Sequence, residues 1–131
     1  MNLVLRDAIQ RMVPYGSRVL DLGCGTGLTL SYNGISKDDY LGVDPSAGML
    51  AKLEAKYGKI KKHNLINNDF FKVQYMTSSF DLVIGNPPFG GSFDPSIEDS
   101  LDKRFGMWNS HKLKKETYSF FIAAALELLV D

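Results

Sequence analysis

The spacing of hydrophobic residues along the chain predicts strands and helices in alternation. Short apolar runs predict four strands, the last the strongest and the third the weakest, near residues 18–22, 40–44, 63–68 and 80–85. Apolar residues three and four positions apart predict amphipathic helices over residues 3–13, 47–57 and 115–130. Strands that alternate with helices are typical of βαβ units, so the pattern predicts an α/β fold with a mostly parallel sheet.

Capping and turn residues mark the ends of the predicted helices. Pro14 and Gly16 end the first helix, while Ser46 is suited to cap the second and Gly58 to stop it. In the last helix one apolar stripe contains Tyr118, Phe121, Ala125 and Leu128. The stretch between the fourth strand and this helix is expected to be a loop.

The predicted elements form a single domain over residues 1–131. A helix that ends near residue 130 should lead back into a fifth strand, and without that strand the apolar segment 80–85 lies at the sheet edge. An exposed apolar edge promotes association. We therefore expect a partial domain that lacks its C-terminal strands, or a sheet that a partner chain completes.

Composition and charge exclude few classes of protein. Hydrophobic residues make up 44% and charged residues 23%, and 15 basic residues balance 15 acidic ones, so the whole chain gives no electrostatic argument for nucleic acid or membrane. The lysine-rich runs at 52–63 and 111–116 are expected to be solvated surface. With no apolar run long enough to span a bilayer, and Cys24 as the single cysteine, the prediction is a cytoplasmic protein without membrane contact.

The first candidate site is the glycine loop after the first strand. Gly23, Gly25 and Gly27 let the backbone turn sharply and approach a ligand closely. Asp21 precedes them, and a carboxylate there suits a ligand with a positive charge or an amine better than a pyrophosphate. The spacing also differs from the G-x-G-x-x-G of dinucleotide enzymes. A glycine loop alone is weak evidence for any ligand.

Further polar residues follow the next two strands. Asp44 ends the second strand, where an acid can accept hydrogen bonds from a ribose diol. Asp69 ends the third strand and Phe70 follows it, a pair that suits the amine and the flat face of an adenine. Each residue alone is as well explained as a turn, cap or core residue. Together they lie at the carboxyl ends of adjacent parallel strands, where open α/β sheets bind ligands.

The fourth strand ends in Asn86, Pro87, Pro88 and Phe89. The two prolines have no backbone N–H and forbid further ladder bonding, and the residue before a proline is held extended. The result is a stiff bend that fixes one amide and one aromatic ring at the end of a strand. His63 and His111 have no cysteine or acidic partners at metal-ligand spacing, so no metal site is predicted.

Four motifs carry a resemblance to a known family, in the order "DLGCGTG", "GVDPS", "NDF" and "VIGNPPFG". They resemble the S-adenosylmethionine-dependent methyltransferases of the Rossmann-like class. The resemblance implies S-adenosyl-L-methionine as the cofactor, with its binding site formed by residues that end the four strands. These are Asp21, Gly23, Gly25, Gly27, Asp44, Asp69, Phe70 and Asn86.

The NPPF motif resembles the amino-methyltransferases, above all the N6-adenine DNA methyltransferases of restriction–modification systems. An exocyclic amine is a poor nucleophile because its lone pair is delocalised into the ring. By this resemblance, the Asn86 side-chain oxygen and the Pro87 carbonyl accept its two hydrogens, and Pro88 helps to hold them in place. Phe89 would stack on the target base, which must leave the duplex to be reached.

The resemblance therefore implies methyl transfer to adenine N6 in DNA, with DNA as the partner. Two alternatives share the chemistry, namely an adenine in RNA and a glutamine side chain in a protein. An alternative of another class is a non-catalytic S-adenosylmethionine-binding module that needs a partner chain.

Overall fold

The computed structural model describes residues 7–8, 11, 14–31, 35–61, 64–75, 79–85, 95–105, 107–108, 111–112 and 117–130. Of the helix predicted over 3–13, only Asp7, Ala8 and Arg11 fall within these ranges, and all three are helical. No helix among the described residues is long and apolar enough to cross a membrane.

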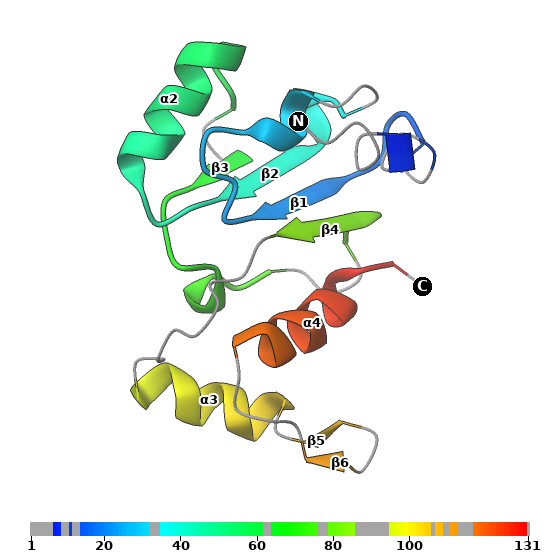
Figure 1. The fold of residues 1–131 in the computed structure, drawn as a ribbon, viewed down its shortest axis with the longest axis vertical. Helices are drawn as coiled ribbons and strands as arrows, with labels where there is room; N and C mark the ends of the chain where they lie inside the picture. Colours follow the sequence, from blue (N-terminus) through cyan, green and yellow to red (C-terminus); the bar gives the residue numbers. More distant parts are fainter. Residues whose placement is uncertain are drawn as a thin grey trace.

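A four-stranded sheet with all its strands parallel lies at the centre of the fold (Figure 1). Its order is β3-β2-β1-β4, with the strands at Leu65–Ile66 (β3), Tyr40–Val43 (β2), Val19–Leu22 (β1) and Leu82–Gly85 (β4). The sheet confirms the predicted α/β, Rossmann-like fold. Each strand is shorter than predicted, and β3 retains only two of the six residues assigned to it.

The register of the sheet brings three strand ends to the same level. Leu22, the last residue of β1, pairs with Val43 at the end of β2 and with Gly85 at the end of β4. The last residues of these three strands therefore lie side by side at the carboxyl edge of the sheet. This is the edge where the sequence predicts the site.

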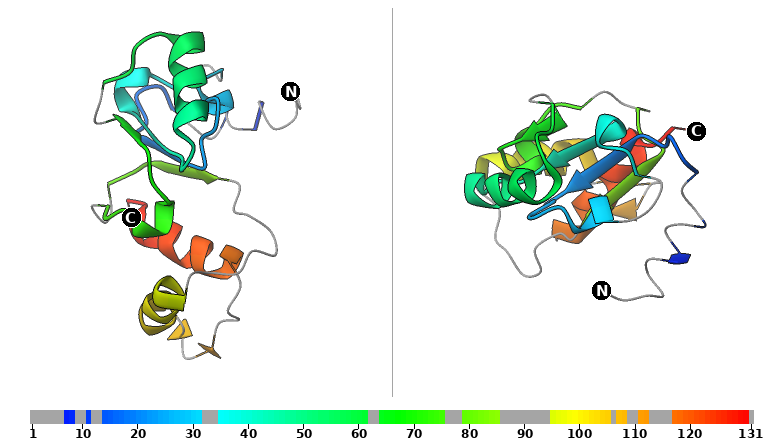
Figure 2. Two further views of the ribbon diagram at one scale, coloured as in Figure 1. Left: turned by 90° about the vertical axis from the view of Figure 1, so that its left-hand side faces the viewer. Right: turned by 90° about the horizontal axis from the view of Figure 1, so that it is seen from above.

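The helix α2 (Ala47–Tyr57) has the predicted bounds and covers one face of the sheet (Figure 2). Its sequence is rich in strong helix formers, the Ser46 hydroxyl accepts a hydrogen bond from the Met49 N–H at 3.3 Å, and the chain leaves it at Gly58 with φ 82°. Leu50 and Leu53 are buried against the sheet.

The helix α4 (Thr117–Leu128) covers the opposite face. Phe121 and Leu128 of the predicted stripe are buried with Leu20, Leu22 and Val43, while the side chain of Tyr118 lies outside the described part. The consecutive apolar residues of 80–85, taken alone, indicate a buried strand, and the structure corrects this. In this strand Leu82, Val83 and Ile84 are half-buried, because β4 is the end strand of the sheet.

Within the described residues, the side of β4 away from β1 has a backbone partner only near the start of the strand. Leu129 forms one parallel bridge with Phe80, and the Val130 N–H donates to the Phe80 carbonyl at 2.9 Å. After α4 the chain thus returns beside the segment that leads into β4.

Two elements lie where the sequence predicted a loop, and that prediction is corrected. The helix α3 (Pro95–Phe105) packs on the side of α4 away from the sheet, and an antiparallel hairpin follows with strands β5 (Met107–Trp108) and β6 (His111–Lys112). Phe120 and Ala123 of α4 are buried against Leu101 of α3. The helix α4 therefore has two buried stripes, of which periodicity revealed one.

Short 3-10 helices complete the connections. One covers Leu28–Ser31 (η1), directly after the glycine loop, and another covers Lys37–Asp39 (η2), before β2. A third, Phe70–Lys72 (η4), follows β3.

We expect Gly85→Ala to destabilise the fold by about 1–3 kcal/mol, the usual cost of overpacking. A methyl group there would lie 2.5 Å from the Phe121 ring and 2.8 Å from the Leu22 carbonyl oxygen. Urea unfolding measures the loss. Gly48→Ala in α2, where only the Ser46 hydroxyl comes near, is the control and should stabilise by up to about 1 kcal/mol. Equal stability of Gly85→Ala and the parent chain would contradict the packing.

Candidate active site

The glycine loop turns over the end of β2. The N–H groups of Gly23 and Cys24 both donate to the Val43 carbonyl oxygen, at 2.8 and 3.1 Å. Gly23 and Gly25 have φ of 74° and 53°, in the left-handed region that favours glycine. A Cβ on Gly25 would have no atom within 4 Å, so this side of the loop is open.

Gly27 has a packing role of its own. A Cβ there would lie 2.7 Å from Leu53 and 3.3 Å from Tyr57, both on α2. The third glycine therefore lets α2 approach the loop closely. The predicted contact of Gly27 with the cofactor stays a prediction beside this role.

Asp44 is fixed at the end of β2 by hydrogen bonds from three directions. Its carboxylate accepts from the Gly25 N–H at 2.9 Å and from the Ser46 N–H at 2.8 Å. Its own N–H donates to the Ile66 carbonyl at 3.0 Å, and its carbonyl accepts from the Asn67 amide at 3.0 Å. The structure thus joins Asp44 to the glycine loop, and it adds Asn67, a brace that the sequence did not reveal.

Asp21 lies beneath the glycine loop and is only 5% exposed. The Tyr40 hydroxyl donates to its carboxylate at 2.8 Å, and the Thr29 hydroxyl is a second donor. Burial is the largest influence on Asp21 and raises its pKa, against the effect of these two donors. Within the described residues no basic side chain forms an ion pair with it.

Cys24 lies in the same buried cluster. Burial, and after it the negative charge of Asp21, raises the pKa of the thiol to about 12. The side chain therefore stays protonated near neutral pH and is a packing residue rather than a nucleophile.

Asp69 lies three residues beyond the end of β3 and not at its end as the sequence predicts, and both Asp69 and Phe70 have local structural roles. The Asp69 carboxylate caps η4 by accepting from the Phe71 N–H at 2.9 Å. The Phe70 ring stands edge-on to Phe121, with 5.4 Å between ring centroids, and packs with the core under α4. Their predicted contact with an adenine stays a prediction.

Asn86, Pro87, Pro88 and Phe89 lie outside the described residues. Gly85, the residue before them, pairs with Leu22, the residue before the glycine loop. The NPPF segment and the glycine loop therefore start from neighbouring points on the sheet edge.

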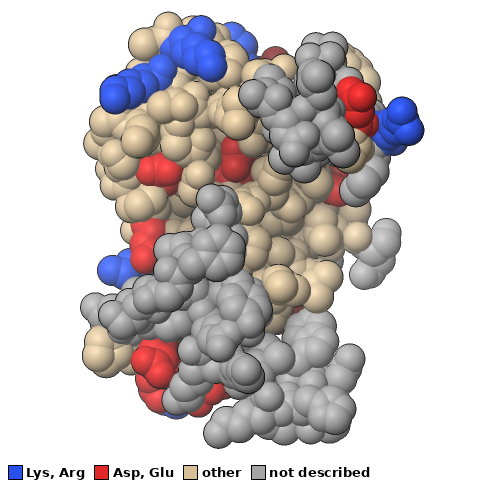
Figure 3. Space-filling model, viewed as in Figure 1, with Lys and Arg blue, Asp and Glu red and all other residues tan. Residues whose placement is uncertain are grey.

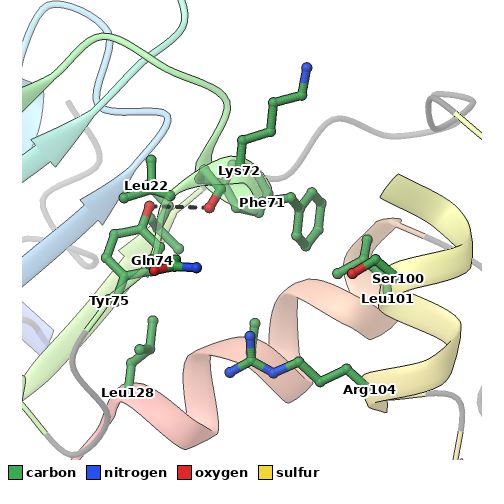
Figure 4. A pocket seen from close by; sticks show the side chains of 12 residues that line it. Leu22, Phe71, Lys72, Gln74, Tyr75, Ser100, Leu101, Arg104 and Leu128 are labelled. Atoms are coloured by element: carbon green, nitrogen blue, oxygen red, sulfur yellow. Dashed lines mark hydrogen bonds between the residues drawn. The ribbon is translucent and has the colours of Figure 1, made fainter. Parts of the chain in front are cut away.

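Two hollows adjoin this edge, since Leu22 at the end of β1 lines the first and Asn67, which donates to Asp44, lines the second. One, of about 440 Å³, lies between the segment from Phe70 to Tyr75, α3 and α4, where the Phe71 ring and the Arg104 guanidinium face it (Figure 4). The other, of about 540 Å³, lies between α2 and β3. Neither is lined by the glycines of the loop. Among the described residues no group of three or more His, Cys, Asp or Glu side chains is arranged to hold a metal ion.

A comparison with known protein families decides the class of the protein. Residues 19–103, which run from β1 into α3, match the family described as a methyltransferase domain. The chain belongs to this family. Membership confirms the predicted cofactor, S-adenosylmethionine. The residues present fit it, since the open side of Gly25 adjoins the Asp44 carboxylate and a buried negative charge lies below the loop.

Individual relatives are similar over part of their length. The chain is 39% identical over 74 residues to a malonyl-[acyl-carrier protein] O-methyltransferase of Legionella pneumophila, covering 53% of this chain and 25% of that protein. It is 30% identical over 106 residues to the release factor glutamine methyltransferase of Escherichia coli, covering 78% of this chain and 38% of that protein. The chain thus spans well under half the length of these relatives.

Solved structures share the fold of this methyltransferase domain. A protein assigned as the modification subunit of a type I restriction enzyme from Vibrio vulnificus matches with a TM-score of 0.68 and 18% identity, over 95% of this chain and 29% of its own. A protein assigned as an rRNA methylase from Clostridium thermocellum matches with a TM-score of 0.61 and 20% identity, over 97% of this chain and 64% of its own.

We expect Asp44→Ala to weaken S-adenosylmethionine binding by about 1–3 kcal/mol, because hydrogen bonds to a charged group are lost and the glycine loop is released from β2. Isothermal titration calorimetry measures the affinity. Asp38→Ala is the control, since Asp38 is an exposed acid of η2 that pairs with Lys61. Unchanged affinity in Asp44→Ala would remove Asp44 from the site.

We expect Asp21→Asn to make the fold more stable at pH 7. Burial raises the pKa of Asp21 in the folded state above its value in the unfolded chain. The contribution of Asp21 to the free energy of unfolding is therefore fully present below the unfolded-state pKa and is lost as pH rises through the folded-state pKa. Asparagine removes this loss, so the gain should grow from pH 4 to pH 7 in urea unfolding.

Asp81→Asn provides a control of opposite sign. Arg18 donates to the Asp81 carboxylate through its side chain and its backbone N–H and lowers the pKa of that carboxyl. This stabilisation is present above the unfolded pKa and is lost as pH falls, so the variant should be less stable at pH 7 and match the parent in acid. The same trend in both variants would contradict the assignment of Asp21.

Proposed function

We propose that the protein transfers a methyl group from S-adenosylmethionine to an exocyclic amino nitrogen, with adenine N6 in DNA as the substrate. The register of β1 with β4 carries the proposal, because it starts the glycine loop and the NPPF segment from paired residues, Leu22 and Gly85. A cofactor bound by the loop and an acceptor bound by NPPF would then meet at one edge.

The cofactor supplies an electrophilic methyl group on a sulfonium. In the proposed mechanism Asp44 and the open side of Gly25 bind the cofactor, and the negative charge of Asp21 favours its cationic part. Asn86 and the Pro87 carbonyl accept the two hydrogens of the target amine, which turns the nitrogen lone pair toward the methyl group. Preorganised acceptors of this kind lower the barrier without reorganisation during the reaction.

Exposed lysines support a polyanionic substrate. Basic side chains gather at the upper left of the molecule, over α2, where Lys52, Lys56 and Lys59 are exposed (Figure 3). The helix α2 begins three residues after Asp44 and leads away from the site edge. Phosphates that flank a base at the site could therefore be contacted along it, and phosphate contacts supply much of the affinity for nucleic acids.

A glutamine side chain of a protein is the second candidate substrate. It is favoured by the identity of 30% to the release factor glutamine methyltransferase of Escherichia coli, over 78% of this chain. An amide nitrogen is planar and weakly nucleophilic like that of adenine, so the same acceptors serve both. Adenine in RNA is a further variant of the same chemistry, and a non-catalytic module that binds S-adenosylmethionine for a partner chain is the competing class.

We expect Asn86→Ala to lower the rate of methyl transfer about a hundred- to a thousandfold, the effect of about 2.7–4 kcal/mol of lost transition-state stabilisation, while cofactor affinity stays within about twofold. Labelled methyl transfer to duplex DNA, structured RNA and a glutamine-containing release factor, assayed side by side, measures it. Phe89→Ala is the matched variant and should instead raise KM for the base through about 1–3 kcal/mol of lost stacking.

The acceptor that takes the label decides among the candidates. Label on adenine N6 of DNA supports the proposal, whereas label on glutamine or on RNA replaces DNA by that substrate. Full activity of Asn86→Ala on every acceptor would refute the mechanism. Cofactor binding without transfer to any acceptor would favour the non-catalytic module.

A further inference from the structure

The buried polar cluster beneath the glycine loop consists of Asp21, Tyr40, Thr29 and Cys24. Asp21 and Val19 point to the same face of β1, and Val19 is fully buried in the core under α2. The titratable groups that face Asp21 are Tyr40 from β2, Cys24 from the glycine loop and Asp44 from the end of β2. None of them is cationic, and Asp44 opposes a charge on Asp21.

The Asp21 carboxylate is therefore stabilised by two hydroxyl groups and by no positive charge within the described residues. A buried carboxylate without a cationic partner is costly, and the group tends to bind a proton instead. A ligand that brings positive charge to the loop removes this cost. S-adenosylmethionine carries two such charges, on its sulfonium and on its ammonium group.

We propose that Tyr40 is a positioning residue that keeps Asp21 ionised beneath the glycine loop, so that binding of the cationic cofactor is coupled to the charge of Asp21. The inference rests on the place of Asp21 in the proposed cofactor site. The Tyr40 hydroxyl donates at 2.8 Å and is held by a side chain only 1% exposed, so its geometry is set by the core. Burial and the neighbouring Asp21 raise the pKa of Tyr40, which stays a donor throughout.

The coupling predicts the sign of a pH dependence. Where Asp21 is protonated in the free protein, cofactor binding releases a proton, and affinity falls by up to about tenfold for each unit of decreasing pH. Where Asp21 is already ionised, affinity is independent of its titration. Removal of a hydroxyl donor favours the protonated form and shifts this dependence to higher pH.

The test is the affinity of the 131-residue chain for S-adenosylmethionine between pH 4.5 and 7, measured by calorimetry in two buffers of different ionisation enthalpy, which also reports proton release. Tyr40→Phe should bind about tenfold more weakly at the acid end and approach the parent chain at pH 7. Asp21→Asn should show neither the pH dependence nor the proton release. Thr29→Val removes the second hydroxyl donor to Asp21 and should also shift the pH dependence of cofactor affinity to higher pH. It replaces Tyr40→Phe in the test if that variant does not fold.

Tyr57→Phe is the matched control. Its hydroxyl is buried and has no hydrogen-bond partner among the described residues, although its ring lies close to Gly27 of the same loop. Tyr57→Phe should bind S-adenosylmethionine with the same affinity as the parent chain at every pH.

An equal loss of affinity at all pH values in Tyr40→Phe would overturn the proposal, because it would indicate damage to the loop alone. An unchanged pH dependence in Asp21→Asn, or a shift in Tyr57→Phe, would overturn it as well. Absence of S-adenosylmethionine binding by the parent chain at any pH would instead refute the proposed function.

Discussion

The structure depends on the register that ends three parallel strands at one level. The Val43 carbonyl accepts hydrogen bonds from both Gly23 and Cys24, so the glycine loop is built onto the last residue of the neighbouring strand. A shift of β2 by one residue would remove this acceptor and move Asp44 away from Gly25. The position of the site is thus a property of the sheet rather than of the loops alone.

Two close approaches of helices to glycines complete this arrangement. Leu53 of α2 occupies the space beside Gly27, and the Phe121 ring of α4 occupies the space beside Gly85. Gly27 lies in the loop after β1, and Gly85 is the last residue of β4. Because neither glycine has a side chain, a core residue of the nearby helix packs directly against its backbone. Side chains from the two faces of the sheet therefore support two parts of the edge, the glycine loop from one face and Gly85, the last residue of β4, from the other.

The sequence predicted the parallel sheet, α2 with its caps, and the positions of the glycine loop and Asp44 at strand ends, because these depend on local periodicity and on residues of special backbone geometry. It misplaced Asp69, which lies three residues beyond the end of β3 and caps η4. It did not reveal α3, since Leu101 packs on a second stripe of α4 and the surrounding residues are mostly charged. It did not distinguish the environments of Asp21 and Asp44 either. Both are acids near glycines in sequence, but the partner of Asp21 is a tyrosine on another strand.

The hydrogen bonds of Asp44 connect four segments to one another, namely the end of β2, the end of β3, the glycine loop and the start of α2. We refer to these four connected segments as the Asp44 joint. A ligand at this joint meets a surface whose backbone freedom was given up during folding, so little further ordering of the chain is needed on binding. Among these four segments β3 has the fewest sheet hydrogen bonds to hold it, because it is a two-residue strand at the end of the sheet. Local opening of β3 would therefore alter the position of Asp44 and, through it, of the glycine loop.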